Sequence, residues 1–147
     1  MATKINIINN YPHFQIQSSA ATVLVTHVLR DEELAASEIS IILIDDEYLR
    51  TLHRDFLNDD TFTDVMTFNL GGDNIVEGEI YISVDRAKHF AAKLSVSPEE
   101  EIARLIIHGL LHLKGYDDQT AEEREKMREM ETFYLRKYAP KIREFIG

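Results

Sequence analysis

The sequence predicts a single α+β domain in which helices cover a small mixed β-sheet. The chain has 147 residues, of which 44% are hydrophobic and 29% charged, an ordinary composition for a globular domain with one core. Short β-rich runs alternate with longer helical stretches, a pattern typical of a sheet covered by helices. No internal repeat, low-complexity tract or linker interrupts the sequence, so residues 1–147 are interpreted as one domain.

Each element has its own local justification. Runs rich in β-branched and aromatic residues predict four strands, INII (5–8), SIILI (40–44), VMTF (65–68) and EIYIS (79–83). Helical periodicity predicts five helices, at about 18–35, 46–57, 84–95, 98–114 and 121–138. The glycine pair in LGGDN (70–74) predicts the turn between the third and fourth strands.

The helix over 98–114 has the best marked ends. Ser97 is a good N-cap, Pro98 suits the first helical position, and Glu100 follows within the first turn. Gly115 is suited to the left-handed conformation that ends a helix. Its buried face is predicted from the apolar residues at three- and four-residue spacing, Ile102, Leu105, Ile106, Gly109 and Leu113. A second capping box, at 120–123, starts the next helix almost at once.

The stretch HGLLHLKGYDD (108–118) is the best candidate for chemistry. His108 and His112 are four residues apart, so their side chains are neighbours on one helix face. Two such imidazoles can hold one tetrahedral ion at about 2.0–2.1 Å, and the turn after the helix can deliver a third ligand. Three protein ligands with the remaining positions left to water are typical of a catalytic site. The chain has no cysteine, so any metal must bind through nitrogen and oxygen.

Structural or surface histidines would explain this spacing almost as well. The capped helix, the glycine stop and the nearby carboxylates are what favour a metal site on the central helix and the following turn. The remaining four histidines have no such context and are interpreted as structural or exposed, namely His13, His27, His53 and His89.

Composition excludes some classes of function. The net charge of -10 argues against a surface coated in positive charge for nucleic acid. Residues 124–147 reverse the sign, with seven lysines and arginines against four acids, and a local basic surface there competes with the simpler interpretation of a solvated helix face. No apolar run is long enough to span a membrane, and the first residues lack a signal-peptide core, so we expect a cytoplasmic protein.

Three sequence blocks resemble the YbeY family of rRNA-maturation endoribonucleases. HGLLHLKGYDD is similar to the family pattern H-G-x-L-H-L-x-G-Y-D-H, with ten of eleven positions in agreement when free positions are included. TDVMTF (63–68) resembles T-D-V-L-S-F, and GEIYIS (78–83) resembles G-D-I-x-I-S. The resemblance implies a metal-dependent, single-strand-specific ribonuclease of α+β type that acts on rRNA and the ribosome or its proteins. It also implies one ion, usually zinc, held by three histidines, two of which are His108 and His112.

The third family histidine is Asp118 in this chain. A carboxylate oxygen can bind zinc at about 2.0–2.2 Å, so we predict Asp118 as the third ligand. Its anionic oxygen moves the expected preference somewhat toward harder ions such as Mn²⁺. Asp117 matches an aspartate of the family pattern and is predicted to orient a ligand or to stabilise the turn.

Two further positions bear on RNA cleavage. The family arginine that is expected to meet a phosphate is replaced by Leu57, and the candidate substitutes are Arg54, Arg86, Lys88, Arg104 and Lys114. Glu79 stands at the aspartate of G-D-I-x-I-S and is predicted to accept the proton from a metal-activated water, with a structural role as the alternative. Attack by the 2′-hydroxyl of the RNA itself stays open.

Two other classes of function compete with the nuclease. One is a metal-dependent hydrolase of peptides or small molecules, and the other is a non-catalytic ribosome-assembly factor in which the ion only stabilises the turn. Gly109 occupies the position at which the H-E-x-x-H zinc proteases carry their catalytic glutamate, which counts against peptide hydrolysis.

Overall fold

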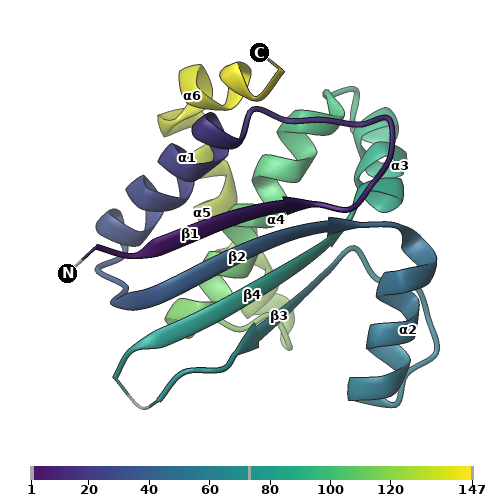
Figure 1. Cartoon of the computed structure of the whole chain (residues 1–147), viewed down its shortest axis with the longest axis horizontal. Coiled ribbons are helices and arrows are strands. Elements are labelled where there is room, and N and C mark those ends of the chain that lie inside the picture. The colour runs from purple at the N-terminus through teal and green to yellow at the C-terminus, as the bar shows by residue number, and fades with distance from the viewer. Residues whose placement is uncertain (1, 73, 147) are drawn as a thin grey trace.

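A four-stranded sheet with the order β1-β2-β4-β3 organises the molecule (Figure 1). The computed structural model describes residues 2–72 and 74–146. The strands are β1 (Lys4–Asn9), β2 (Ala36–Ile44), β3 (Val65–Asn69) and β4 (Val76–Ser83). The first, second and fourth strands are parallel, and β3 joins the edge of β4 antiparallel. The predicted mixed sheet is therefore confirmed.

Helices cover the two faces of the sheet unequally. On one face lie α1 (Ser18–Asp31), α4 (Pro98–Lys114) and α5 (Ala121–Lys137), with α3 (Val84–Leu94) and α6 (Ala139–Arg143) completing that layer (Figure 1). The other face carries α2 (Asp46–Leu57), whose Leu49 packs against Ile42, Ile44 and Met66. The main core therefore lies between the sheet and α4, and a smaller core lies under α2.

The structure differs from the predicted elements mainly at their ends. α1 ends at Asp31, four residues earlier than predicted, because Glu33 adopts a left-handed backbone conformation with φ 53°. β2 begins at Ala36, ahead of the predicted run at 40–44. Its first residues alternate between the two faces of the sheet and lack a continuous apolar run, so the prediction placed the start of the strand too late. Pro140 lies in the first turn of the unpredicted α6, which the short 3₁₀ helix Glu144–Ile146 follows.

The predicted turn between the third and fourth strands joins an antiparallel pair. The Leu70 N–H donates to the Glu77 carbonyl at 2.7 Å, which closes the hairpin. Asp73 of the predicted turn lies outside the described residues. Among the helices that the structure describes, none combines the length and hydropathy that a membrane span requires.

The central helix α4 has the ends predicted for it. The Ser97 hydroxyl accepts a hydrogen bond from the Glu100 N–H, and Gly115 ends the helix at φ 118°. Gly109 faces the sheet: a Cβ added there would lie 2.8 Å from Cδ1 and Cγ2 of Ile80 on β4. The absence of a side chain at this position therefore lets the helix approach the sheet closely, one residue after His108.

Replacing Gly109 by alanine is expected to lower the free energy of unfolding by about 1–2 kcal/mol. Overpacking a core costs roughly 1–3 kcal/mol, and the better helix propensity of alanine offsets up to about 1 kcal/mol of it. Urea denaturation measures the difference. Gly72→Ala is the matched control because a Cβ there meets nothing within 4 Å. Equal stability of the two variants would contradict the packing argument.

Candidate metal centre

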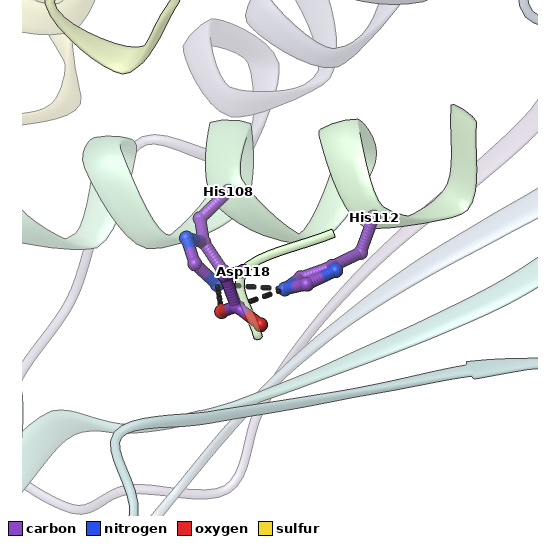
Figure 2. Close-up of side chains that lie close together, drawn as sticks. All are labelled: His108, His112 and Asp118. Atoms are coloured by element: carbon purple, nitrogen blue, oxygen red, sulfur yellow. Dashed lines mark hydrogen bonds and ion pairs between the residues drawn. The ribbon is translucent and has the colours of Figure 1, made fainter. Parts of the chain in front are cut away.

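Two histidines of α4 and one aspartate of the following turn point their side chains at one another (Figure 2). Nε2 of His112 lies 3.0 Å from Nε2 of His108 and 3.2 Å from Oδ2 of Asp118. Nε2 of His108 lies 3.5 Å from the same carboxylate oxygen. The structure thus brings together the three residues that the sequence predicts as metal ligands.

These distances fit a single tetrahedral ion. A zinc ion bound at about 2.0–2.1 Å to each ligand separates its ligand atoms by roughly 3.3–3.4 Å. The three observed separations, 3.0, 3.2 and 3.5 Å, bracket that value. The side chains of His108, His112 and Asp118 are 16%, 26% and 31% exposed, so the centre is open to solvent on one side. The cluster could therefore bind a metal ion and still leave room for water or substrate.

Glu131 of α5 fixes the orientation of the first histidine. Its Oε2 lies 2.7 Å from Nδ1 of His108, and its side chain is only 3% exposed. Burial would raise the pKa of the Glu131 carboxyl, but hydrogen bonds from His108 and Arg104 outweigh it and lower that pKa below its ordinary value. An ionised carboxylate only accepts hydrogen bonds, so Nδ1 of His108 carries the hydrogen and Nε2 presents its lone pair to the centre.

Arg104 compensates the buried acids beside the centre. Its Nε donates to Oε1 of Glu101 at 2.8 Å, its Nη1 donates to Oε1 of Glu131 at 2.9 Å, and its Nη2 lies 3.8 Å from Oδ2 of Asp64. Burial would lower the pKa of Arg104, but the hydrogen bonds to Glu101 and Glu131 raise it above its ordinary value. This arginine is therefore held by carboxylates and is not available to a phosphate.

The turn after α4 is held in place by its own hydrogen bonds. The Asp118 N–H donates to Oδ1 of Asp117 at 2.8 Å, and Nη1 of Arg124 donates to the Gln119 carbonyl at 3.0 Å. Asp117 thus stabilises the backbone that presents Asp118, in keeping with the turn role predicted for it.

An open cleft of about 550 Å³ leads to the three candidate ligands. Its walls come from α2, β3 and the residues just before it, and α4 with its turn. The lining residues are His53, Leu57, Thr63, Asp64, Val65, Met66, Thr67, Phe68, Asn69, His108, His112, Leu113, Asp117, Asp118 and Gln119. None of the five arginines and lysines suggested as substitutes at position 57 belongs to this lining.

Those basic side chains are engaged or directed elsewhere. Arg86 pairs with Asp46 at 3.1 Å, and Arg54 lies 3.3 Å from Asp55. Lys88 stacks over the Tyr11 ring, and Lys114 is exposed at the end of α4. Arg104 is held by Glu101 and Glu131, and none of the five belongs to the residues that line the cleft.

Glu79 does not join the cluster. Side chains alternate between the faces of a strand, and Gly78 and Ile80 of β4 face α4, with Leu113 of α4 against Gly78. Glu79 therefore lies on the opposite face of the sheet, where its Oε1 accepts a hydrogen bond from the Tyr81 hydroxyl at 3.1 Å. Burial and this bond raise the pKa of Tyr81 to about 12, so the phenol stays a donor at neutral pH. This placement corrects the interpretation of Glu79 as a proton acceptor beside the metal and favours the structural alternative.

Sequence reasoning missed three residues near the centre. Glu131 lies in the buried stripe of α5 with Met127 and Tyr134, at helical spacing, and Glu101 lies in the buried stripe of α4. A carboxylate inside an apolar stripe is the signal that could have identified both. His53 was interpreted as structural or exposed, but it lines the cleft.

Comparison with known proteins agrees with these observations. A sequence model of the family described as Endoribonuclease YbeY matches residues 6–139. The Endoribonuclease YbeY of Cytophaga hutchinsonii is 40% identical over 114 residues, which are 76% of this chain and 80% of that protein. The one of Salinibacter ruber is 32% identical over 146 residues and 92% of each chain. The protein TM1509 from Thermotoga maritima, solved in solution, matches with a TM-score of 0.67 and 26% identity over 95% of this chain and 91% of its own. The chain therefore belongs to the Endoribonuclease YbeY family.

Proposed function

We propose that this protein is a metal-dependent endoribonuclease that cleaves single-stranded RNA in the maturation of small-subunit rRNA and in ribosome quality control. The observation that carries the proposal is the convergence of His108, His112 and Asp118 in an open cleft of a chain that belongs to this family. Its proposed partners are rRNA and the ribosome or ribosomal proteins, and its proposed place of action is the cytoplasm, where those partners are found.

The proposed ligands are Nε2 of His108, Nε2 of His112 and a carboxylate oxygen of Asp118, with zinc as the preferred ion and Mn²⁺ as the alternative. A divalent ion held there supplies an activated water at neutral pH and offsets negative charge on the phosphate in the transition state. The protein contributes the fixed orientation of the ligands, through Glu131 on one side and the turn that contains Asp117 on the other.

A proton acceptor for the attacking water is better sought in the cleft than on β4. Asp64 lines the cleft and belongs to the TDVMTF block, and its carboxylate lies 3.8 Å from Arg104 without a closer charged partner among the described residues. A carboxylate at such a position can take a proton directly or through one water. We therefore propose Asp64 in place of Glu79 for this role.

The proposed function is tested by metal analysis of the purified protein combined with cleavage of a single-stranded RNA. We expect the metal-loaded protein to cleave the RNA. Chelation should abolish cleavage, and addition of Zn²⁺ or Mn²⁺ should restore it. A sample with full metal content that cleaves peptides but no RNA would favour the competing hydrolase. Two results together would favour the assembly factor. The wild type would show no cleavage even in the presence of ribosomes, and His112→Ala would lower the stability of the protein.

Replacing Glu79 by glutamine is expected to leave RNA cleavage within about twofold of the wild type, because the side chain belongs neither to the ligand cluster nor to the residues that line the cleft. Asp64→Asn is expected to lower kcat by roughly 10²–10⁴, the range for loss of a general base. Steady-state cleavage of the same RNA at equal metal content compares the two variants. If Glu79→Gln lowered kcat far more than Asp64→Asn did, the role of proton acceptor would belong to Glu79 and not to Asp64.

A further inference from the structure

The cleft is poor in positive charge for a site that receives RNA. Apart from the two candidate metal ligands of α4, His53 is the one lining residue that can carry a positive charge. Three aspartates, Asp64, Asp117 and Asp118, line the same cleft. An RNA phosphate that enters it therefore meets acidic walls and needs a donor close to the ion.

His53 has the geometry of such a donor. Its side chain is only 13% exposed, although its neighbours in the sequence, Arg54 and Asp55, are exposed. Its Nδ1 lies 3.1 Å from the Thr61 carbonyl, which can only accept, so Nδ1 carries a hydrogen. Its Nε2 lies 3.9 Å from Oδ2 of Asp59 and has no partner at hydrogen-bond distance among the described residues. The ring is thus fixed at one nitrogen and available at the other.

We propose that His53 meets the RNA as an imidazolium, with a hydrogen on each ring nitrogen. Its Nδ1 keeps the bond to the Thr61 carbonyl, and its Nε2 donates a hydrogen bond to a non-bridging phosphate oxygen, which holds the scissile strand between α2 and the metal centre. The proposal rests on the proposed ribonuclease function, which it deepens by naming a substrate contact. Leu57, one helical turn further along α2, lines the same wall and offers the strand only an apolar surface. Position 53 therefore supplies the polar contact that the end of this helix otherwise lacks.

A purely structural role for His53 is the competing explanation. The bond to Thr61 ties α2 to the segment that leads into Asp64 and β3, and this bond alone would favour a histidine. Asparagine and glutamine separate the two roles. The amide that His53→Asn introduces reaches about as far as Nδ1 and keeps the Thr61 bond, but it offers nothing at the place of Nε2. His53→Gln reaches about as far as Nε2 and gives up the Thr61 bond.

The test compares these variants by kcat/KM on a single-stranded RNA, at equal metal content and with thermal unfolding measured in parallel. His53→Asn is expected to lower kcat/KM by about 10–100-fold, the range for a hydrogen bond to a charged group, while its stability stays near that of the wild type. His53→Gln is expected to retain more activity than His53→Asn in spite of lower stability. His89→Asn, at an exposed histidine of α3, is the control that should change neither quantity.

A second measurement separates failure of this contact from failure of the proposed function. A short single-stranded 2′-deoxy oligonucleotide is added to the zinc-loaded wild type, and the imidazole ¹⁵N resonances are followed by NMR. A shift of the His53 Nε2 resonance, with the His89 resonances unchanged, is expected. If the wild type cleaves RNA but His53→Asn equals it, or His53→Gln is the weaker variant, the contact is refuted and the nuclease stands. If the wild type cleaves no RNA, the proposed function fails and the NMR result alone tests the contact. A shift of the His53 Nε2 resonance would support the phosphate contact, and an unchanged resonance would refute it.

Discussion

Replacing Asp118 by alanine is expected to abolish metal-dependent RNA cleavage by this protein. The variant keeps two imidazoles but loses the donor that lies 3.2 and 3.5 Å from their Nε2 atoms. Loss of a residue that only orients a ligand already lowers metal affinity by about 10–100-fold, and loss of the ligand itself should exceed that. Zinc affinity is measured by competition with a chromophoric chelator, and cleavage is measured on single-stranded RNA at a fixed free zinc concentration.

Asp117→Ala is the matched control for this prediction. Asp117 is the adjacent carboxylate and lines the same cleft, but it bonds to the Asp118 N–H and does not belong to the donor cluster. Its removal should loosen the turn and weaken zinc binding far less than Asp118→Ala does. Full metal content in Asp118→Ala together with loss of metal in Asp117→Ala would reverse the assignment of the third ligand.

A third variant, Asp118→His, restores the histidine that the family pattern has at this position. An imidazole at 118 replaces an anionic oxygen by a neutral nitrogen, so the site should lose relative affinity for Mn²⁺ and keep zinc. The larger ring also reaches further than a carboxylate, and the turn must move outward to admit it. Retained cleavage with zinc in this variant would show that aspartate and histidine serve the same purpose at this position.

The sequence predicted the sheet and the central helix because both depend on local patterns. The runs at 40–44 and 79–83 are apolar enough to mark strands, and Ser97, Pro98 and Gly115 mark the ends of α4. The cluster of His108, His112 and Asp118 was also predicted. The four-residue spacing places both histidines on one helix face, and the helix end at Gly115 keeps the following turn close to them. The segment after Tyr138 was missed because a short helix that begins near a proline has too few residues for a periodic pattern.

The misplacement of Glu79 has a different cause. The apolar residues Gly78, Ile80 and Ile82 alternate with Glu77 and Glu79, and this alternation already indicates that the acids face away from the core. The similarity of GEIYIS to a family block suggested a role in the reaction and overrode the pattern. Asp64, which belongs to the other block, reaches the cleft because it precedes β3, at the edge of the sheet nearest to the turn.

The contacts that tune the centre could not be read from single-residue spacing. Glu131 lies 23 residues after His108, and only the packing of α5 against α4 brings its carboxylate to Nδ1. His53 likewise reaches the cleft through the packing of α2 beside β3. Such long-range contacts depend on the angle and register of whole elements, which periodicity within one element does not determine.

Replacing Glu131 by glutamine is expected to weaken zinc binding by about 10–100-fold and to lower RNA cleavage at limiting zinc. The two carboxylate oxygens have two donors to satisfy, Nη1 of Arg104 and Nδ1 of His108. A glutamine has only one amide oxygen. If that oxygen stays with Arg104, its NH₂ faces His108, Nδ1 must accept, and the ring hydrogen moves to Nε2, where it blocks the metal. If the amide turns round, its NH₂ meets the guanidinium instead. The first arrangement thus puts a hydrogen on the nitrogen that should bind the metal, and the second leaves two donors facing each other.

Glu101→Gln distinguishes this effect on His108 from a loss of charge compensation. Glu101 is as deeply buried as Glu131 and bonds to the same Arg104, but it makes no contact with a candidate ligand. Both substitutions should lower the free energy of unfolding, by roughly 1–3 kcal/mol, because each disturbs the hydrogen bonds of a buried charged group. Only Glu131→Gln should also change zinc affinity. Equal zinc affinities for the two variants would mean that His108 is oriented by the helix alone, and that Glu131 belongs to the core of the protein rather than to its metal centre.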